Sequence, residues 1–311
     1  MLSLRRSIPR RTGAADPAPG GALVTGAGGG LGAEIADLLA RRGHVVHVTD
    51  VDGDAAEATA RRIGNGAFAS VLDVRDDPAC AAAARRTVER AGSLRVWVNN
   101  AGVLVTGPAW EQTAEQRRLM VEVNAIGTMN GTVAAIAEMK ESGGHIVTIV
   151  SLAGLVAVPG EGVYAGTKHA AIGFSLSTQT DLHLAGLKDI HISCVCPDGI
   201  WTPMLHDKLD DPQAALSFSG KLLQPGEVVD AVGRVLDRPR QVTVVPAWRG
   251  WQVRLADAVP DLSLKALPLV VKQARRAQRA YARTLPARTA PDQVPHQIPD
   301  RVTHRVADRG A

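Results

Sequence analysis

The sequence predicts an α/β fold, in which a doubly wound, mostly parallel sheet of about seven strands carries helices on both faces. Two observations lead to this prediction. Short runs of β-branched and aliphatic residues alternate with longer stretches in which apolar residues recur every three or four positions, as expected for βαβ units. Runs such as "HIVTIV" are apolar almost throughout, which is typical of parallel strands buried on both faces.

The candidate strands are seven short apolar runs. They span residues 22–25, 44–49, 67–72, 95–99, 145–150, 190–195 and 242–245. The stretches between them, such as "LGAEIADLLARRG" and "AAIAEMKESG", predict amphipathic helices. One domain, about 20–247, is therefore expected to carry the fold. Residues 1–20 are expected to form a disordered basic leader, and 248–311 a basic, partly helical extension with a disordered end.

Charge and cysteine usage restrict the classes of function. The net charge is +4, but residues 1–20 carry +3 and the segment from 247 onward carries +7, which leaves the middle at −6. The basic charge lies in the appendages, so we expect no nucleic-acid partner. The three cysteines have neither a disulfide framework nor metal-ligand spacing, so we expect no metal and a cytoplasmic protein. Cys194 and Cys196 are expected to point to opposite faces of one strand.

Membrane contact is expected to be peripheral at most. The paired arginines near the N-terminus are followed by Asp, Pro and Gly, which is not the pattern of an export signal. No stretch reaches the ~18 apolar residues of a membrane span. After Pro268, "LVVKQARRAQRAYARTL" predicts a basic helix that ends before Pro286. We favour docking of this helix on the acidic core or on a second subunit of a homo-oligomer; the alternative is an anionic membrane surface.

A glycine-rich turn follows the first predicted strand in "ALVTGAGGGLGAEIADLLA". The strand ends at Thr25 and a helix opens near Leu31. Glycines permit close backbone approach and a helix N-terminus binds phosphate, so the turn predicts a dinucleotide site. The second predicted strand ends in Asp50, whose carboxylate can bind both adenosine ribose hydroxyls and repel a 2′-phosphate. We therefore expect NAD in preference to NADP. The alternatives are that the glycine turn is purely structural and that Asp50 merely starts the loop.

Three further residues predict a catalytic centre. Tyr164 begins "YAGTK" and stands one helical turn before Lys168, so both side chains share a helix face. Ser151 lies 13 residues upstream of Tyr164 at the end of a predicted strand, where α/β sheets bind ligands. Each residue alone has a structural explanation, but their joint spacing favours catalysis.

These motifs resemble those of the short-chain dehydrogenase/reductase family, of its shorter single-domain type, over nearly all of 20–247. The resemblance implies a Rossmann fold and a catalytic tetrad completed by Asn124 in "VEVNAIGT". It implies that Ser151 holds the substrate oxygen and that Asn124 positions a water that relays protons. Lys168 is implied to bind the nicotinamide ribose, and its charge is expected to lower the pKa of Tyr164, the general base.

The resemblance also assigns cofactor contacts. The family's TGxxxGxG turn falls on Gly26, Gly30 and Gly32, and matching strand ends supply further positions. The implied contacts are Gly26, Gly30, Leu31, Gly32, Asp50, Asp73, Val74, Asn100, Ala101, Gly102, Tyr164, Lys168, Ile200 and Thr202. One departure is Asp198, which stands where the family usually has Gly and affects the expected backbone around the nicotinamide amide.

The predicted function is that of an NAD(P)-dependent dehydrogenase acting on CH–OH groups, which interconverts a secondary alcohol and a ketone. Two alternatives are a catalytically silent NAD-binding regulatory protein and an epimerase- or dehydratase-like member of the family's extended branch. Segment 200–225 corresponds to the family's substrate lid. Its apolar residues predict a bulky apolar substrate, with plain packing as the alternative. They are Trp201, Met204, Leu205, Leu209, Leu216, Phe218, Leu222 and Leu223.

Overall fold

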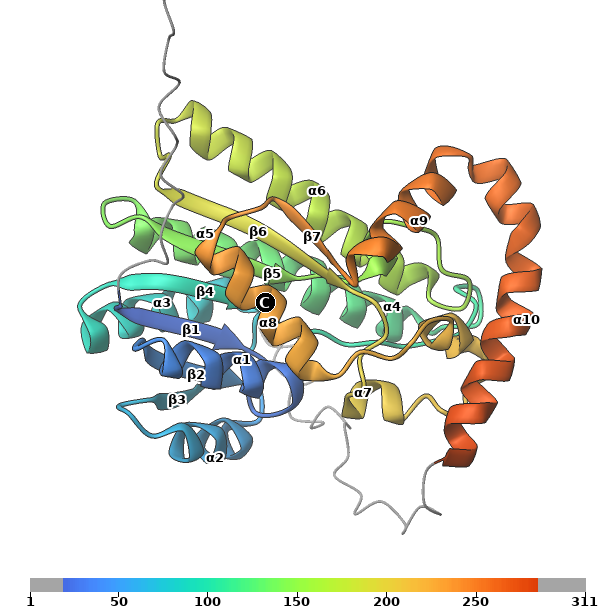
Figure 1. Ribbon diagram of the computed structural model, residues 1–311. Helices are drawn as coiled ribbons and strands as arrows, with labels where there is room; N and C mark the ends of the chain where they lie inside the picture. Colours follow the sequence, from blue (N-terminus) through green and yellow to red (C-terminus); the bar gives the residue numbers. More distant parts are fainter. Residues whose placement is uncertain (1–18, 285–311) are drawn as a thin grey trace, which may run out of the picture.

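The computed structural model describes residues 19–284 (Figure 1). Within them, seven strands form one sheet in the order β3-β2-β1-β4-β5-β6-β7, and every neighbouring pair is parallel. The strands are β1 (Gly21–Thr25), β2 (Val45–Asp50), β3 (Phe68–Val71), β4 (Leu94–Asn99), β5 (Gly144–Ile149), β6 (Ile190–Pro197) and β7 (Val242–Val245). Each overlaps the run predicted for it, so the predicted doubly wound sheet is confirmed.

Helices cover both faces of this sheet (Figure 1). One face packs against α1 (Gly30–Arg41), α2 (Gly53–Ile63) and α8 (Pro225–Asp237). The other face packs against α3 (Asp77–Ala91), α5 (Gly127–Met139) and α6 (Gly162–Leu184). The remaining helical segments are α4 (Ala114–Val121), η1 (Glu122–Ile126), η2 (Leu152–Gly154), α7 (Pro203–His206), η3 (Pro212–Phe218), α9 (Ala247–Ala258) and α10 (Pro260–Thr284).

The core follows the alternation of side chains along each strand. Leu23 and Trp97 are fully buried against α3 and α5, whereas Val24, Val96 and Val98 are fully buried on the opposite face against α1 and its neighbours. Successive strand residues point to opposite faces, so strands buried on both sides must be apolar throughout. The continuous apolar runs in the sequence have this cause.

The strand order places a ligand-binding crevice at the edge where the strands end, which we call the carboxyl edge. From β1 the chain runs outward through β2 and β3, then returns to β4 and continues in the other direction. The loops after β1 and β4 therefore diverge, which leaves a crevice at this switch point. Every predicted catalytic and cofactor residue lies on or beyond a strand end or on a helix that faces this edge.

One helical stretch, Ala114–Met139, is long and apolar enough, by length and composition alone, to cross a membrane. Half of its apolar window is buried inside the protein, and α5 within it packs against α3 and β4. It is a core helix of this fold.

The prediction for the two cysteines of β6 is wrong. Cys194 and Cys196 are both fully buried in the same apolar cluster, together with Val150 and Ile172. Residues two apart on a strand project to the same face, because the side-chain period is two. Both thiols therefore lie on the face covered by α6.

The C-terminal helix is longer than predicted. α10 begins at Pro260 and continues through Pro268, where the sequence predicted that the helix would only start. Proline removes one backbone hydrogen bond, the one to Leu264 four residues earlier. Leu264 is exposed, so water can take the place of the missing donor. Residues 1–18, which include most of the predicted leader, and 285–311, the predicted disordered end, lie outside the described residues.

Candidate active site

The glycine turn lies between β1 and α1 and is shaped by contact with the loop after β4. Gly26 has φ +61°, and a Cβ there would lie 2.8 Å from the Ala101 Cα. A Cβ on Gly32 would lie 2.3 Å from the Gly26 carbonyl oxygen. Only glycine fits these two positions. The predicted residues Gly26, Gly32 and Ala101 are thus brought together.

The outer part of the same turn is open. A Cβ on Gly29 or Gly30 would meet no atom within 4 Å, and no side chain among the described residues caps the first turn of α1. The N–H groups that begin a helix carry partial positive charge and attract anions. Gly30, Leu31 and Gly32 begin α1 at this point. The turn therefore fits a pyrophosphate group.

Asn100 and Thr25 fix the turn to the end of β4. The Asn100 Nδ2 donates to the backbone oxygens of Thr25 (3.0 Å) and Gly26 (2.8 Å). The Thr25 hydroxyl accepts from the backbone N–H groups of Asn100 (3.0 Å) and Ala101 (3.1 Å). Asn100 was expected to contact the cofactor; in the structure its amide holds the loop that would bind it. The sequence prediction did not include Thr25 among the site residues.

Asp50 lies beside the turn, as predicted. Its Oδ2 accepts from the Gly28 N–H at 2.9 Å, and its Oδ1 accepts from the Asp52 N–H at 3.0 Å. The carboxylate is therefore oriented by two backbone donors and is only partly buried. A carboxylate accepts several hydrogen bonds at once, so acceptor capacity remains for ribose hydroxyls.

Asp73 lies after β3 and is part of an ion pair. Its carboxylate accepts from Arg75 at 2.6 Å (Oδ2 to Nη2), and the Arg75 guanidinium also approaches Glu122 at 3.7 Å. Burial acts to raise the pKa of Asp73, but its hydrogen bonds with Arg75 outweigh burial, so the pKa is lowered. Asp73 is therefore charged at neutral pH. Val74, the next residue, is buried and packs closely against Gly127.

The predicted catalytic residues converge beside the end of β5. Ser151 immediately precedes η2, and its Oγ accepts from the Ala153 N–H at 3.1 Å. Tyr164 lies in the first turn of α6, and the Ser151 side chain is close enough to lower the pKa of its hydroxyl. Lys168, one turn later on α6, places its Nζ 5.6 Å from the centre of the Tyr164 ring. The strand end and one helix face thus bring all three together.

Lys168 and Asn124 meet at Gly102. The Lys168 Nζ is buried and donates to the Ile149 carbonyl oxygen at 3.2 Å. A Cβ on Gly102 would lie 3.3 Å from the Asn124 Oδ1 and 3.7 Å from the Lys168 Nζ. Gly102 therefore leaves space over both groups.

Asn124 lies on η1, a π-helical turn between α4 and α5. Its Oδ1 accepts from the Val103 N–H (2.8 Å), and its Nδ2 donates to the Val103 carbonyl oxygen (2.9 Å) and to the Thr167 Oγ1 (3.2 Å). The side chain thus joins the loop after β4 to helix α6. π-Helical turns within α-helices occur frequently at functional sites.

The expected effect of Lys168 on Tyr164 is not found in the chain alone. Part of the Tyr164 side chain is exposed, but its hydroxyl is buried, and this burial raises the pKa of Tyr164 well above its usual value. The charge of Glu161 raises it further, while the Ser151 side chain lowers it. Burial also lowers the pKa of Lys168 to about 8. Tyr164 is therefore protonated at neutral pH.

Glu161 is a site residue that the sequence prediction missed. It is only 2% exposed, stands three residues before Tyr164, and accepts a hydrogen bond from the Ser217 hydroxyl at 2.6 Å. Burial and the charge of Asp211 raise the pKa of Glu161 to about 7, against the opposing effects of Ser217 and Lys208. Its signal in the sequence is an acidic residue immediately before the helix that carries Tyr164 and Lys168.

Replacing Glu161 by Gln tests this environment. The pKa of Glu161 is about 7 in the folded protein against 4.5 for the free side chain, so the folded state binds the proton more tightly. The corresponding stability, up to about 3 kcal/mol, is full below about pH 4.5 and is lost as the pH rises through about 7. Urea unfolding measured across this pH range should show the free energy of unfolding falling with pH in the wild type. In Glu161→Gln the free energy of unfolding should depend less on pH. Equal profiles would contradict a buried, titrating Glu161.

Asp198 has a partner that explains the departure from the family pattern. Its Oδ2 accepts from the Arg249 Nε at 2.7 Å, and its Oδ1 accepts from the Gly199 N–H at 3.0 Å. Arg249 lies on α9 and also donates to the Ser219 hydroxyl at 2.9 Å. The side chains of Asp198 and Arg249 are 8% and 15% exposed. Asp198 thus connects the loop after β6 to the lid and the C-terminal extension.

The other two residues predicted in this loop lie at the start of the lid. Ile200 forms an isolated parallel bridge with Leu223, which joins the two ends of the lid. The Thr202 N–H donates to the Ile200 carbonyl oxygen at 2.8 Å, and Thr202 precedes α7. Both residues therefore shape the lid backbone.

Most apolar lid residues are packing residues. Leu205, Leu209, Phe218 and Leu222 form a buried cluster against which Trp201 and Tyr281 of α10 pack. The packing alternative therefore holds for these residues, and they do not support a bulky apolar substrate. Met204, by contrast, is exposed.

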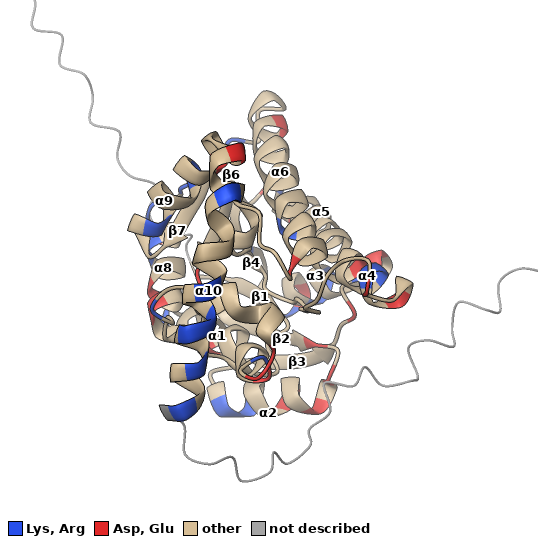
Figure 2. Ribbon diagram, turned by 90° about the vertical axis from the view of Figure 1, so that its right-hand side faces the viewer, with Lys and Arg blue, Asp and Glu red and all other residues tan. Residues whose placement is uncertain are grey.

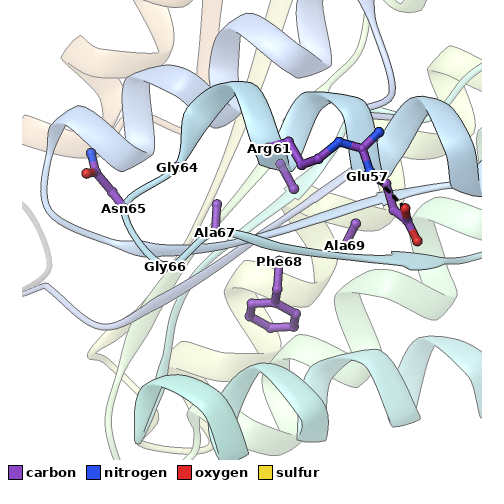
Figure 3. Close-up of a pocket in the computed structure, with 9 residues that line it drawn as sticks. Glu57, Arg61, Gly64, Asn65, Gly66, Ala67, Phe68 and Ala69 are labelled. Carbon is purple, nitrogen blue, oxygen red and sulfur yellow. Dashed lines mark hydrogen bonds and ion pairs between the residues drawn. The ribbon is translucent and has the colours of Figure 1, made fainter.

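A surface hollow of about 360 Å³ lies elsewhere, between the end of α2 and the start of β3 (Figure 3). Its lining includes Glu57, Arg61 and Asn65. Figure 3 shows Phe68 directed away from the other lining side chains, and its ring stacks on His47 at 4.2 Å. The hollow borders the amino end of β3, opposite to the carboxyl edge, so it is not the active site.

Comparison with known proteins agrees with this geometry. The family model described as short chain dehydrogenase matches residues 21–213. The chain is 34% identical to cyclopentanol dehydrogenase of Comamonas testosteroni over 68% of this chain and 86% of that protein. It is 35% identical to trans-4-hydroxycyclohexanecarboxylate dehydrogenase of Sinomonas cyclohexanicum over 59% of this chain and 73% of that protein.

A solved structure shares the fold. A short chain dehydrogenase/reductase from Burkholderia phymatum, determined in complex with NAD, superposes with a TM-score of 0.73 at 25% sequence identity. The match covers 79% of this chain and 96% of that chain.

Proposed function

The chain belongs to the short-chain dehydrogenase family, and from this premise we propose that it is an NAD-dependent dehydrogenase that interconverts a cyclic secondary alcohol and its ketone. The observation that carries the proposal is the convergence of Ser151, Tyr164 and Lys168 at the carboxyl edge, next to the open glycine turn. Oxidation of an alcohol needs a proton acceptor beside a hydride acceptor, and we assign these roles to Tyr164 and to a dinucleotide bound at the glycine turn.

The residues present fit a nicotinamide dinucleotide. The open positions at Gly29 and Gly30 and the uncapped start of α1 leave room for a pyrophosphate, and Asp50 can accept hydrogen bonds from a ribose. When bound, the oxidised nicotinamide would accept the hydride from the alcohol carbon. A solved relative in complex with NAD supports this assignment.

The side chains of the site would bind the substrate and the cofactor and transfer the proton. Ser151 would hold the substrate oxygen, and the Tyr164 oxygen would take the hydroxyl proton during oxidation or return it during reduction. Lys168 would bind the nicotinamide ribose and favour the phenolate by its positive charge. Asn124 would hold the loop after β4 against α6, as its bonds to Val103 and Thr167 indicate, and position a relaying water.

Asp50 should select the cofactor. Because its carboxylate repels a 2′-phosphate, we expect NAD to be preferred over NADP by at least about tenfold in kcat/KM. Asp50→Ser should narrow this ratio, chiefly by improving the use of NADP. Steady-state kinetics with both cofactors tests the expectation, with Asp54→Ser, at an exposed position of α2, as the matched control. Equal wild-type efficiency with both cofactors would show that Asp50 does not select the nucleotide.

The proposed substrate class comes from the relatives. Cyclopentanol dehydrogenase and trans-4-hydroxycyclohexanecarboxylate dehydrogenase are both named for cyclic secondary alcohols. A panel of cyclic, linear and steroidal secondary alcohols, assayed with NAD⁺ by the absorbance of the reduced cofactor, tests this class. Turnover of cyclic alcohols supports the proposal. Activity confined to primary or acyclic alcohols would contradict it.

A further inference from the structure

The C-terminal extension exposes large apolar side chains. These belong to α9, to the first half of α10 and to the residue between them: Trp248, Trp251, Leu255, Val259, Leu262, Leu264, Leu269 and Val270. Trp251 is 78% exposed, Leu255 69% and Leu262 68%. Trp248, Trp251 and Leu255 are three and four residues apart, so they share one face of α9. Such a concentration of exposed apolar side chains indicates an interaction surface.

This segment is held to the domain at both ends. At one end, Arg249 of α9 is paired with Asp198. At the other end, the buried Gln278 of α10 donates to the backbone oxygens of Lys208 (2.9 Å) and Asp211 (2.7 Å) in the lid. Tyr281 packs against Trp201 and Phe218. The exposed apolar residues between these attachments therefore lie on a docked helix pair, which projects at the right edge of Figure 1.

The same helices are strongly basic. Residues 247–284 carry eight Lys or Arg and two Asp, a net charge of +6. On α10 one stripe, spaced by three, four or seven residues, holds Leu262, Lys265, Leu269, Lys272, Arg276 and Arg283. Ala274 and Gln278 are buried on the opposite face. Figure 2, which views this side of the molecule, shows blue Lys and Arg ribbon along α10.

We propose that α9 and α10 form a docking surface for an anionic lipid bilayer. Tryptophan is favoured at the interface between water and lipid, leucine side chains can enter the acyl boundary, and Lys and Arg bind anionic headgroups. Together, α9 and α10 supply all three kinds of contact. Neither apolar burial nor charge alone has to hold the protein, because the two act together.

Charge decides between lipid and a second copy of the chain. An isologous dimer through this surface would bring two basic helix pairs against each other, and they remain basic after Arg249 is discounted for its pairing with Asp198, which is unfavourable. An anionic bilayer has the complementary charge. The surface also adjoins the lid, because its helices contact lid residues through Gln278 and Arg249. The bilayer face would be the cytoplasmic one if the protein is cytoplasmic, as we propose.

Vesicle sedimentation of the full chain tests the proposal. The probes are vesicles of phosphatidylcholine alone and of phosphatidylcholine with phosphatidylglycerol. We expect at least about tenfold stronger binding to the anionic vesicles, and weaker binding as salt rises. Trp251→Ser/Leu255→Ser and Lys272→Ala/Arg276→Ala should each reduce the binding about tenfold. The matched control, Trp110→Ser/Leu184→Ser, removes exposed apolar side chains from other elements and should bind as the wild type does.

Three outcomes would overturn the proposal. The first is a wild-type chain that does not sediment with anionic vesicles, whatever the variants do. The second is binding that the control variant loses as strongly as the α9 variant does. The third is a change of oligomeric state, measured by light scattering, in Trp251→Ser/Leu255→Ser with lipid binding intact. That result would assign the surface to a second copy.

Discussion

Tyr164→Phe should lower turnover at least about 100-fold, because it removes the one positioned group that can exchange a proton with the substrate oxygen. The phenol oxygen is the only atom lost, and it lies beside Ser151 in a buried site. Water cannot easily take its place. The fold and the affinity for NAD should be kept, because the ring remains and the glycine turn is untouched.

Steady-state kinetics on a substrate from the alcohol panel gives the turnover, and calorimetry gives the NAD affinity. The matched control is Tyr281→Phe, which removes the other phenol oxygen of the chain from the lid contact. Tyr281→Phe should retain most of the activity. Near wild-type turnover in Tyr164→Phe would contradict the assignment of Tyr164 as the catalytic residue. Loss of NAD binding in that variant would indicate a structural role for Tyr164.

Arg249→Met should destabilise the folded protein by about 3 kcal/mol, since it leaves the carboxylate of Asp198 buried without its partner. For a domain of this size that loss corresponds to a fall in Tm of about 6–12 °C. Arg279→Met, an exposed position on α10, is the matched control and should change Tm little.

The double variant Asp198→Gly/Arg249→Met separates pairing from general damage. Removing both charges leaves no unpaired buried group, so the double variant should be more stable than Arg249→Met alone. Thermal unfolding of the wild type, Arg249→Met, Asp198→Gly and the double variant completes the cycle. Strictly additive losses would show that the two side chains are not coupled, despite the 2.7 Å contact.

The parts of the fold that local patterns encode were predictable. The strands could be read from continuous apolar runs, because both faces of this sheet are covered. The glycine turn was predictable as well, because its close contacts require glycine at fixed positions. Gly26 packs against Ala101, and Gly32 packs against the Gly26 carbonyl oxygen. Spacing along one helix placed Tyr164 beside Lys168.

Contacts between distant segments were not predictable. Asp198 and Arg249 are 51 residues apart, and Glu161 and Ser217 are 56 apart, so no local pattern shows either pair. The pKa of Tyr164 depends on burial, which the sequence does not reveal, and the charge of Lys168 was expected to dominate instead. The lid residues were identified as apolar, but whether they face substrate or each other depends on how α10 packs.

The central claim is that this chain transfers hydride from a secondary alcohol to NAD⁺. A cyclic secondary alcohol deuterated at its carbinol carbon tests the claim most directly, with the reduced cofactor examined by mass spectrometry. We expect one deuterium per molecule of reduced cofactor, an equal amount of ketone, and loss of both products in Tyr164→Phe. Reduced cofactor without deuterium, or deuterium transfer that Tyr164→Phe leaves unchanged, would contradict the account.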